Sequence, residues 1–575
     1  HSKDVFQRQT VAALAAVEGE AVRRPAGEEV SALGEVPTTP VQHWFFATPQ
    51  ERPGHFDQYV VLDLAPGTDR AALATAVAAL PARHDALRTT VTAVDGRLEQ
   101  HVAERADLPL RTEDLGALPA GERAEAADRL LAEELERPYD LARGPLSRAL
   151  LVRLAADEHL LLLAQHHIVT DGWSVGVLTR ELAALLRAEA TGEPDGLPAP
   201  ALQYPDYAHW EQHRPADHAP ELAYWKRALA GLPTLRLPTD RPRPAERAGH
   251  GAAHRHHLPA ELVDRLRHLA AGRGTTVFTL FAGASALLLS RHSGQRDVAF
   301  GTVVNGRERR ELEEVTGFFV NTVVLRGDVD ERATVDRFVE SMRTTLLDAF
   351  AHAEVPFDRV VEELAPPRDP SRTPLVQVAV VQQTPAAPAP AGGLRFTDHP
   401  LPRPAARFDL VLEFTPDEAD GGCTLTVEYD TDLFDRRTVT ALAAHLHRLL
   451  AGMADGPRRT LAELPMIPEE EQRGLLASRK PPQELPGTDP ALPSGWSRVH
   501  VLDRARRPQP VGVPGELYLA GYLPDQPDER LVPDPYGAPG EAMYGTGELV
   551  RWTADGGLEH LGRVEERAKP RGGET

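Results

Sequence analysis

The sequence predicts an α/β protein with two similar-sized units, each a sheet with packed helices, followed by a small, mainly β unit. Its 575 residues are too many for a single hydrophobic core. Strand-like and helix-like patterns alternate over residues 36–197 and again over residues 254–455. The tail from Trp496 is rich in Gly and Pro and has a strand-like pattern. We therefore expect a cleft between the first two units, where ligands usually bind.

The first unit is expected to begin with a strand at Tyr59–Leu64 and a helix at Arg70–Leu80. Two apolar runs, Leu146–Leu154 and His159–His167, predict a hairpin whose strands are joined by a four-residue loop. The stretch Pro198–Pro244 is rich in proline but also carries aromatic residues, which indicates an ordered crossover to the second unit.

In the second unit, the segment Thr275–His292 has apolar residues at helical spacing and predicts a buried helix. The segment Thr384–Gly393 is rich in Pro, Ala and Gly and predicts a loop or hinge. The predicted strands of this unit are Val298–Val304, Val320–Leu325 and Val376–Gln382.

Composition excludes several classes of protein. Hydrophobic residues make up 42% and charged residues 26%, as in ordinary globular proteins. The net charge of −22 argues against nucleic acid or an anionic membrane as the main partner. No apolar stretch reaches the length of a membrane span, and no secretory signal is visible. The only cysteine is Cys423, so we expect no disulfide framework, no cysteine metal site and a cytoplasmic location.

The most informative segment is His166–Gly172, with the sequence HHIVTDG. It follows a buried strand and precedes a helix for which the sequence predicts Ser174 as the N-cap. Adjacent residues of a strand point to opposite faces, so at most one of the two histidines faces a given cavity. An imidazole held at a strand end can accept a proton from an amine or hydroxyl nucleophile.

The pattern HHxxxDG between a strand and a helix resembles the signature of the condensation domains of nonribosomal peptide synthetases, which are chloramphenicol acetyltransferase-like acyltransferases. The resemblance covers residues 36–460. It implies an α/β fold of two chloramphenicol acetyltransferase-like lobes in a V-shaped pseudo-dimer, with a tunnel open at both faces. Further segments that resemble family motifs, in the expected order, are Arg83–Thr89, Tyr204–Trp210, Gly301–Arg307, Gly317–Thr322, His352–Phe357 and Arg368–Leu375.

The resemblance also implies a reaction, in which the amine of an acceptor aminoacyl group attacks the thioester of a donor peptidyl group. Both groups would arrive on phosphopantetheine arms of donor and acceptor peptidyl carrier proteins, with adjacent synthetase domains as further partners. The chain itself would bind no cofactor and no metal, and no cofactor-binding residue is identified.

Within the implied site, His167 is the catalytic candidate that orients the amine, removes its proton or stabilises the tetrahedral intermediate. His166, Asp171 and Gly172 complete the candidate catalytic group. His166 is expected to support the fold and Asp171 to fix the loop. Gly172 is expected to allow close backbone approach, and its amide to help stabilise an oxyanion.

Four further residues are expected to support this group. Asp171 is predicted to form a bidentate ion pair with Arg83 or Arg88, although both arginines could equally lie on a solvated helix face. Trp173 either lines the tunnel or packs in the core. Asn321 lies in the bridging region together with Arg307, where we expect a structural role for both.

The resemblance divides the chain into six parts. They are a carrier-protein C-terminal helix at 1–18, a linker at 19–35, an N-lobe at 36–210, a C-lobe at 211–460, a linker at 461–495 and a partial adenylation domain at 496–575. In the last part, Val511–Tyr518, Tyr544–Leu549 and Gly562–Glu565 resemble adenylation motifs. Glu548 stands where that family has the Asp that holds the ribose, and the family's phosphate loop and most of its amino-acid pocket are missing. A tail of roughly 80 residues is also too small to enclose ATP and an amino acid, so we expect no adenylating activity.

Three alternatives stay open. Thr39–Phe46 looks more like the start of the related epimerization domains than of condensation domains. The chain could also be a catalytically silent platform that recruits partner enzymes, or an acyltransferase that uses a coenzyme A thioester. The intact His167, Asp171 and Gly172 favour catalysis, whereas the flanking carrier-like and adenylation-like segments favour an assembly line.

Overall fold

The structure is a computed structural model. It describes residues 34–39, 41–42, 57–94, 97–213, 218–307, 309–383, 394–396, 405–417, 420–477, 497–521, 529–553 and 555–564. The helix predicted at 1–18, the loop predicted at 384–393 and most of the linker at 19–35 lie outside these ranges. None of the helices within these ranges combines the length and the apolar character that crossing a bilayer requires.

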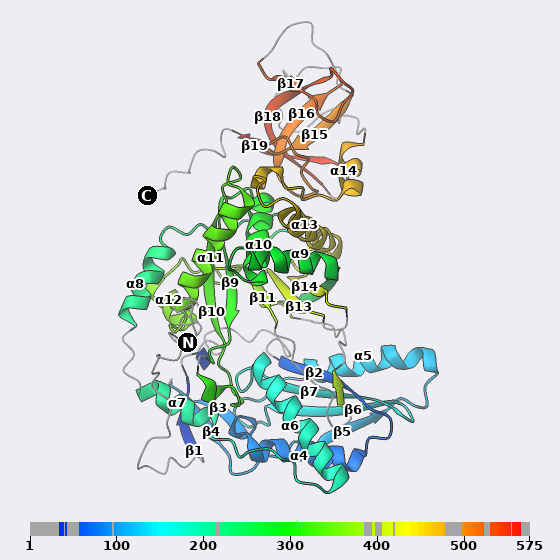
Figure 1. Cartoon of the computed structure of the whole chain (residues 1–575), viewed down its shortest axis with the longest axis vertical. Coiled ribbons are helices and arrows are strands. Elements are labelled where there is room, and N and C mark those ends of the chain that lie inside the picture. The colour runs from blue at the N-terminus through cyan, green and yellow to red at the C-terminus, as the bar shows by residue number, and fades with distance from the viewer. Residues whose placement is uncertain are drawn as a thin grey trace.

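The first unit is built on a five-stranded sheet in the order β12-β2-β7-β6-β5 (Figure 1). The β6–β7 hairpin pairs Ala155 with Glu158, so its turn encloses only Ala156 and Asp157 and is shorter than predicted. The strands are β2 (Asp57–Leu64), β5 (Leu110–Asp114), β6 (Ser147–Ala155), β7 (Glu158–His166) and β12 (Leu394–Phe396).

Helices cover both faces of this sheet, which explains why β7 is an unbroken apolar run. On one face, Leu161 and Leu163 share a core with α4 (Arg70–Arg83) and α6 (Gly172–Thr191). On the other face, Leu160 and Leu162 pack with α5 (Ala120–Glu136). Successive residues of β7 thus enter the two cores in turn, which fixes the face that each later residue of the strand occupies.

A small antiparallel sheet, β1-β4-β3, lies beside the first unit together with α7 (Tyr204–His213). Its strands are β1 (Gly34–Pro37), β3 (Thr89–Val94) and β4 (Arg97–Val102). The described part of the proline-rich crossover contains two helices, α7 and α8 (Ala219–Ala228).

The second unit carries a six-stranded mixed sheet in the order β10-β9-β11-β13-β14-β8. Its strands are β8 (Gly251–Leu258), β9 (Asp297–Val304), β10 (Asn321–Asp328), β11 (Val378–Gln382), β13 (Leu410–Pro416) and β14 (Cys423–Asp430). Its helices are α9 (Ala260–Ala271), α10 (Val277–Ser293), α11 (Val335–Ala351), α12 (Phe357–Leu364) and α13 (Arg436–Asp455). The predicted helix at 275–292 is α10, which is buried along almost its whole length.

One strand connects the two units. β12 comes from the second half of the chain, yet it pairs antiparallel with β2, with Leu394 opposite Leu64. The first sheet therefore takes its edge strand from beyond the boundary predicted at residue 210. The units are not simply consecutive segments, because β12 follows strands of the second unit along the chain and yet pairs with the first sheet.

The C-terminal part is a small sheet in the order β15-β16-β18-β17, with β19 paired to β18. It lies at the far end of the second unit, beside α14 (Glu469–Leu476), and its inner residues belong to the same hydrophobic core as that unit. The strands are β15 (Arg498–Leu502), β16 (Gly515–Ala520), β17 (Leu531–Pro533), β18 (Ala542–Trp552) and β19 (Leu558–Arg563).

Candidate active site

The HHIVTDG segment forms the turn between β7 and α6, as its local pattern predicts. The N-cap of α6 is Asp171 and not Ser174, which corrects the prediction. Asp171 has extended backbone angles, and its Oδ1 accepts hydrogen bonds from Ser174 N at 2.9 Å and Ser174 Oγ at 2.8 Å. Asp is among the residues that best satisfy the unpaired N–H groups of a first helical turn.

His167 lies against a cavity of about 430 Å³. Its Nδ1 is 2.6 Å from the carbonyl oxygen of Thr170, which can only accept, so Nδ1 carries the proton. In that tautomer Nε2 is the basic nitrogen of the ring. Burial, and then the charge of Arg407, lower the pKa of His167 to about 4, so the imidazole is neutral at pH 7. The ring of Phe318 packs edge-on at 4.9 Å.

His166 lies on the opposite face of β7 and is not among the residues that line the cavity. Its Nδ1 accepts the N–H of Ile168 at 3.1 Å. Tyr139 meets its ring edge-on at 5.6 Å. Burial, followed by His167 and Arg148, lowers the pKa of His166 to about 3. His166 therefore stays neutral and packs in the turn that presents His167.

The ion-pair partner of Asp171 is Arg307, and not Arg83 or Arg88 as predicted. The Oδ2 of Asp171 lies 2.6 Å from Arg307 Nη1, and both side chains have 0% exposure. The same oxygen accepts from Phe319 N at 3.1 Å. Arg307 also donates to Ser174 Oγ at 2.8 Å. Asp171 thus joins the end of β7, in the first unit, to the bridging segment of the second unit.

The two arginines predicted to hold Asp171 are engaged elsewhere. Arg83 ends α4, which packs along α6, so its Nε meets Glu181 Oε2 on α6 at 2.7 Å. Arg88 pairs with Asp85 in the same short turn and donates to Pro81 O at 2.8 Å. Helix packing puts both guanidinium groups out of reach of the β7 turn, although neither lies on a solvated helix face.

Gly172 is the first residue of α6, and it lines the cavity. A Cβ built on Gly172 would meet only Gln58 Oε1 and Gln383 Oε1, each at 3.9 Å, which is ordinary van der Waals distance. Its backbone is not in the left-handed region that favours glycine. The fold therefore accepts a side chain at this position, and the glycine keeps space open inside the cavity.

Trp173 and Asn321 also line the cavity, but they hold different parts of its wall. Trp173 is 38% exposed and donates from Nε1 to Glu313 O at 2.7 Å, so it is a lining residue and not a core residue. Asn321 donates to the carbonyls of Ala353 at 2.8 Å and Val355 at 2.7 Å. Asn321 thereby fixes the connection between α11 and α12, a structural role.

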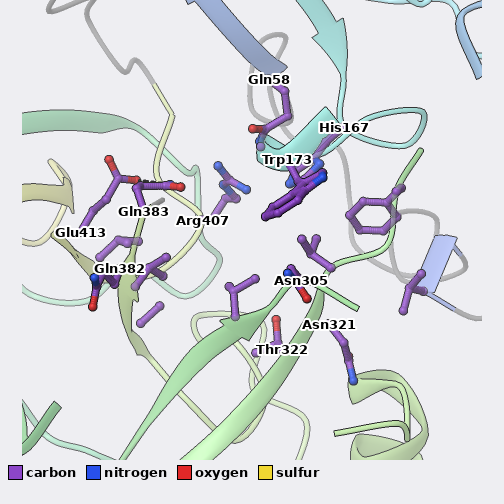
Figure 2. Close-up of a pocket in the computed structure, with 18 of the residues that line it drawn as sticks. Gln58, His167, Trp173, Asn305, Asn321, Thr322, Gln382, Gln383, Arg407 and Glu413 are labelled. Carbon is purple, nitrogen blue, oxygen red and sulfur yellow. Dashed lines mark hydrogen bonds between the residues drawn. The ribbon is translucent and has the colours of Figure 1, made fainter. Parts of the chain in front are cut away.

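Both units contribute to the cavity wall (Figure 2). Sequence reasoning missed four wall residues, which are Gln58 on β2, Gln383 after β11, Arg407 before β13 and Glu413 on β13. Gln383 Nε2 donates to Glu413 Oε2 at 3.0 Å, across the cavity from Trp173 in this view. These residues come from separate elements and share no short motif, so a single sequence carries no local signal for them.

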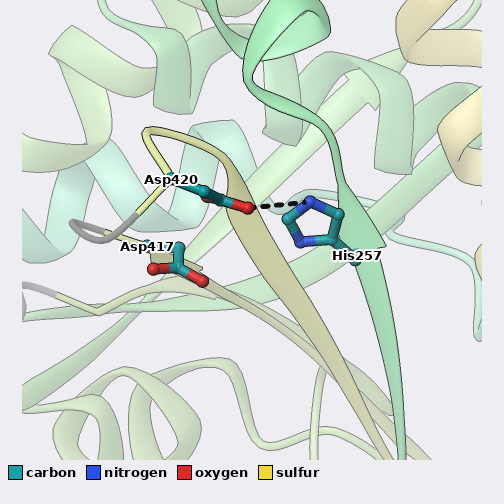
Figure 3. A group of neighbouring side chains, drawn as sticks. All are labelled: His257, Asp417 and Asp420. Carbon is teal, nitrogen blue, oxygen red and sulfur yellow. Dashed lines mark ion pairs between the residues drawn. The ribbon is translucent and has the colours of Figure 1, made fainter.

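A second group of side chains has the composition of a cation site (Figure 3). The ligand atoms of His257, Asp417 and Asp420 lie within 4.8 Å of one another, and no other such group occurs in the described ranges. They lie where β8 ends beside the turn between β13 and β14, and none of them lines the cavity. His257 Nε2 is 3.2 Å from Asp420 Oδ2, an ion pair that attaches this turn to β8.

Comparisons with known proteins identify the family. The family model of the condensation domain matches residues 32–476. Phosphinothricin tripeptide synthetase PhsC of Streptomyces viridochromogenes is 39% identical over 462 residues, which cover 79% of this chain and 42% of that protein. Chondramide synthase cmdD of Chondromyces crocatus is 36% identical over 450 residues, which cover 77% of this chain and 11% of that protein. The chain spans less than half the length of these curated relatives.

Solved structures share the fold. In the complex of the X-domain and OxyB from teicoplanin biosynthesis, the matching chain is 30% identical with a TM-score of 0.67, and the match covers 79% of this chain and 100% of that one. The first condensation domain of the calcium-dependent antibiotic synthetase is 23% identical with a TM-score of 0.63, covering 75% and 99%. Together, the family match and these relatives show that this chain belongs to the condensation-domain family of nonribosomal peptide synthetases.

Proposed function

We propose that the chain is a condensation domain that forms an amide bond between a donor acyl or peptidyl thioester and the amine of an acceptor aminoacyl group. Both groups are delivered on phosphopantetheine arms of carrier proteins. The observation that carries the proposal is His167, a buried, neutral imidazole on the cavity wall whose proton is held on Nδ1 by Thr170. The neutral ring leaves Nε2 free to accept a proton from the amine, although a pKa of about 4 makes it a weak base.

In this reaction the amine nitrogen attacks the thioester carbonyl carbon, an N–C bond forms and the C–S bond breaks. Nε2 of His167 takes the proton that the nitrogen loses and returns it to the departing sulfur. Holding both tethered reactants together supplies up to about 7–11 kcal/mol of the barrier. General base action adds a factor of roughly 10² to 10⁴. Positioning therefore outweighs proton transfer, since a neutral amine is already a good nucleophile.

The neighbours of His167 then have separate tasks. Asp171, bound to Arg307, holds the turn and thus the direction of the imidazole. Gly172 leaves room for the reacting carbonyl, and its amide can stabilise the oxyanion of the tetrahedral intermediate. We further propose that the two units form the two lobes of a V and that the cavity is part of a tunnel reached from both faces, one for each carrier protein.

The C-terminal sheet is proposed to be part of an adenylation domain without adenylating activity. The Oε2 of Glu548 is 2.7 Å from His560 Nε2 on the neighbouring strand, and Arg563 Nε lies 4.0 Å from its other oxygen. A carboxylate already engaged inside the sheet is poorly placed to hold the ribose hydroxyls of ATP. This supports a structural role for the sheet as a platform beside the second unit.

Transfer between carrier proteins tests the proposal. A donor-loaded and an acceptor-loaded carrier protein are mixed with the chain, and intact-protein mass spectrometry follows the donor mass. We expect that mass on the acceptor with wild type and far more slowly with His167→Ala. His213→Ala changes an exposed histidine at the end of α7, and this control should transfer like wild type. Transfer from a coenzyme A thioester instead would favour the acyltransferase alternative.

Two other outcomes would replace the proposal. A donor that exchanges its α-hydrogen for deuterium without transfer would favour epimerization. Neither signal with matched carrier proteins would favour a recruiting platform. The 30% identical X-domain was solved in complex with OxyB, so a protein of this fold with a bound partner protein is a concrete precedent for that alternative.

A further inference from the structure

A buried polar cluster lies behind β7, on the face opposite to the cavity. Asp57 opens β2, and its partner across the strand pair is His166. Directly opposed residues place their side chains on the same face, so Asp57 and His166 share the face that α5 covers. Gln58 follows Asp57 on β2, and His167 directly follows the last residue of β7; both line the cavity. One strand pair thus carries the cavity on one face and this cluster on the other.

Tyr139 and Arg148 complete the cluster. The Tyr139 ring meets His166 edge-on at 5.6 Å, and the guanidinium carbon of Arg148 lies 3.6 Å from the Tyr139 ring centroid. Arg148 also donates to the carbonyls of Glu134 and Arg137 at the end of α5, at 2.7 and 2.6 Å. The cluster therefore connects the end of α5 to the strand end that presents the histidine pair.

Two polar atoms in this cluster are buried without a hydrogen bond in the described part of the chain. They are Asp57 Oδ2 and the hydroxyl of Tyr139. A buried acceptor or donor without a partner reduces stability, and apolar residues would pack at the same place without that cost. A destabilising group that is kept beside a candidate active site is a candidate for a functional role.

Asp57 is the group of this cluster that changes charge near neutrality. Burial raises its pKa to about 7, and the charge of Arg148 opposes the rise in part. His166, facing it from β7, has a pKa of about 3. Tyr139 follows α5, and its pKa is raised by burial and then by Asp57, with Glu134 on α5 adding to the rise.

We propose that Asp57 is a positioning residue of the active site, which acts through His166 on the turn that carries His167. This inference rests on the proposed function of His167. Because His166 Nδ1 accepts from Ile168 N at 3.1 Å, the proton of His166 must be on Nε2. An ionised carboxylate on the same face of the strand pair favours that tautomer through its charge, since it attracts the positive end of an N–H group. The ionised form of Asp57 therefore stabilises the turn geometry that presents His167.

The first test compares single-turnover transfer rates against pH for wild type, Asp57→Asn and Asp63→Asn. Asp63 lies on the same strand and serves as the matched control. We expect wild type and Asp63→Asn to gain rate as the pH rises through about 7. Asp57→Asn should lose that gain and be about tenfold slower above it, with unchanged KM for the carriers, because a small misplacement of a reacting group is costly. Asp57→Glu should recover part of the rate.

A rise in rate with pH that all three proteins share is assigned to deprotonation of the acceptor amine and not to Asp57. Asp57→Asn with the rate and the full pH profile of wild type would overturn the proposal.

The second test does not depend on activity. Nitrogen chemical shifts of His166 and His167 should change with pH near 7 in wild type and stay constant in Asp57→Asn. Stability should also respond: a carboxyl with a raised folded pKa contributes stability at low pH that is lost as the pH rises through about 7. Asp57→Asn should therefore raise the melting temperature above pH 7 and leave it unchanged near pH 4. Histidine shifts that titrate identically in both proteins would contradict the inference even if wild type transferred nothing.

Discussion

A single carboxylate, that of Asp171, carries out several structural tasks in the candidate site. It caps α6 through Ser174, and it binds Arg307 and the Phe319 amide of the other unit. Such a fully satisfied buried carboxylate rigidifies its surroundings, whereas a partly satisfied one destabilises them. The direction in which the preceding histidine points therefore depends on contacts made at the junction of both units.

Removing either partner of this buried ion pair should destabilise the protein. We expect Asp171→Ala and Arg307→Ala each to lower the free energy of unfolding by about 3–5 kcal/mol, because each leaves an unpaired buried charge. The double variant should cost less than the sum. Arg180→Ala removes an exposed ion pair with Glu314 between the same two segments and should cost at most about 1 kcal/mol. Chemical denaturation measures all four, and equal effects of Arg180→Ala and Arg307→Ala would contradict this account.

Gly172 should matter for activity and not for folding. An added methyl group meets no atom closer than 3.9 Å but occupies cavity space. We expect Gly172→Ala to keep the melting temperature while transfer falls by about tenfold or more, since access to the reacting centre is reduced. Gly474→Ala on α14, where a Cβ meets nothing within 4 Å, is the matched control and should change neither. Undiminished transfer by Gly172→Ala would remove the glycine from the site.

At this scale the sequence identifies residues whose pattern is local. The histidine pair, Asp171 and Gly172 lie within one turn, so their spacing alone places them together. The partner of Asp171 could not be found in the same way, because Arg307 is 136 residues away and the choice among several arginines depends on helix packing. The wall residues Gln58 and Glu413 were missed for the same reason.

Among the elements, the long periodic ones follow from the sequence. The apolar runs of β6 and β7 and the buried helix α10 lie within a few residues of their predicted bounds. β12 has three residues and contributes too short a pattern to be recognised, yet it links the two units by pairing with β2. Pairing between distant strands is a tertiary event that local propensity does not encode.

Besides the shared hydrophobic core, ion pairs of Glu331 join the C-terminal sheet to the second unit. Glu331 lies between Arg507 of the C-terminal part, at 2.7 Å, and Arg291 of α10, at 3.0 Å. Burial raises the pKa of Glu331, but the two arginines outweigh burial and leave the pKa below its ordinary value. A depressed folded pKa contributes stability that is present above the unfolded pKa and is lost as the pH falls through the folded one.

We therefore expect Arg507→Ala to weaken this contact, most clearly at neutral pH. Amide hydrogen exchange in β15 and β16 should accelerate relative to wild type, with the difference shrinking in acid once the pH falls below the lowered pKa of Glu331. Arg551→Ala removes an ion pair with Glu559 inside the C-terminal sheet and is the control. Exchange that accelerates as much in Arg551→Ala would show that the effect is not specific to the contact.

At the scale of the whole molecule, the cavity exists only because two sheets are brought together. His167 and Gln58 come from the first unit, whereas Asn321, Gln383 and Glu413 come from the second. The sequence predicts the two α/β units and a cleft between them, since alternation of elements is a global pattern. That pattern does not show that β12, which comes from the second half of the chain, pairs with the sheet of the first unit. The family match over residues 32–476 spans both units, so the cavity belongs to the part shared with the family.

The most direct test of the central claim is the single-turnover rate of donor transfer by His167→Ala relative to wild type, with both carrier proteins loaded. We predict a loss of roughly 10²- to 10⁴-fold. The melting temperature should be unchanged, since Asp171 and Arg307 still hold the turn. A His167→Ala protein that transfers the donor at the wild-type rate would contradict the account and remove this imidazole from the reaction.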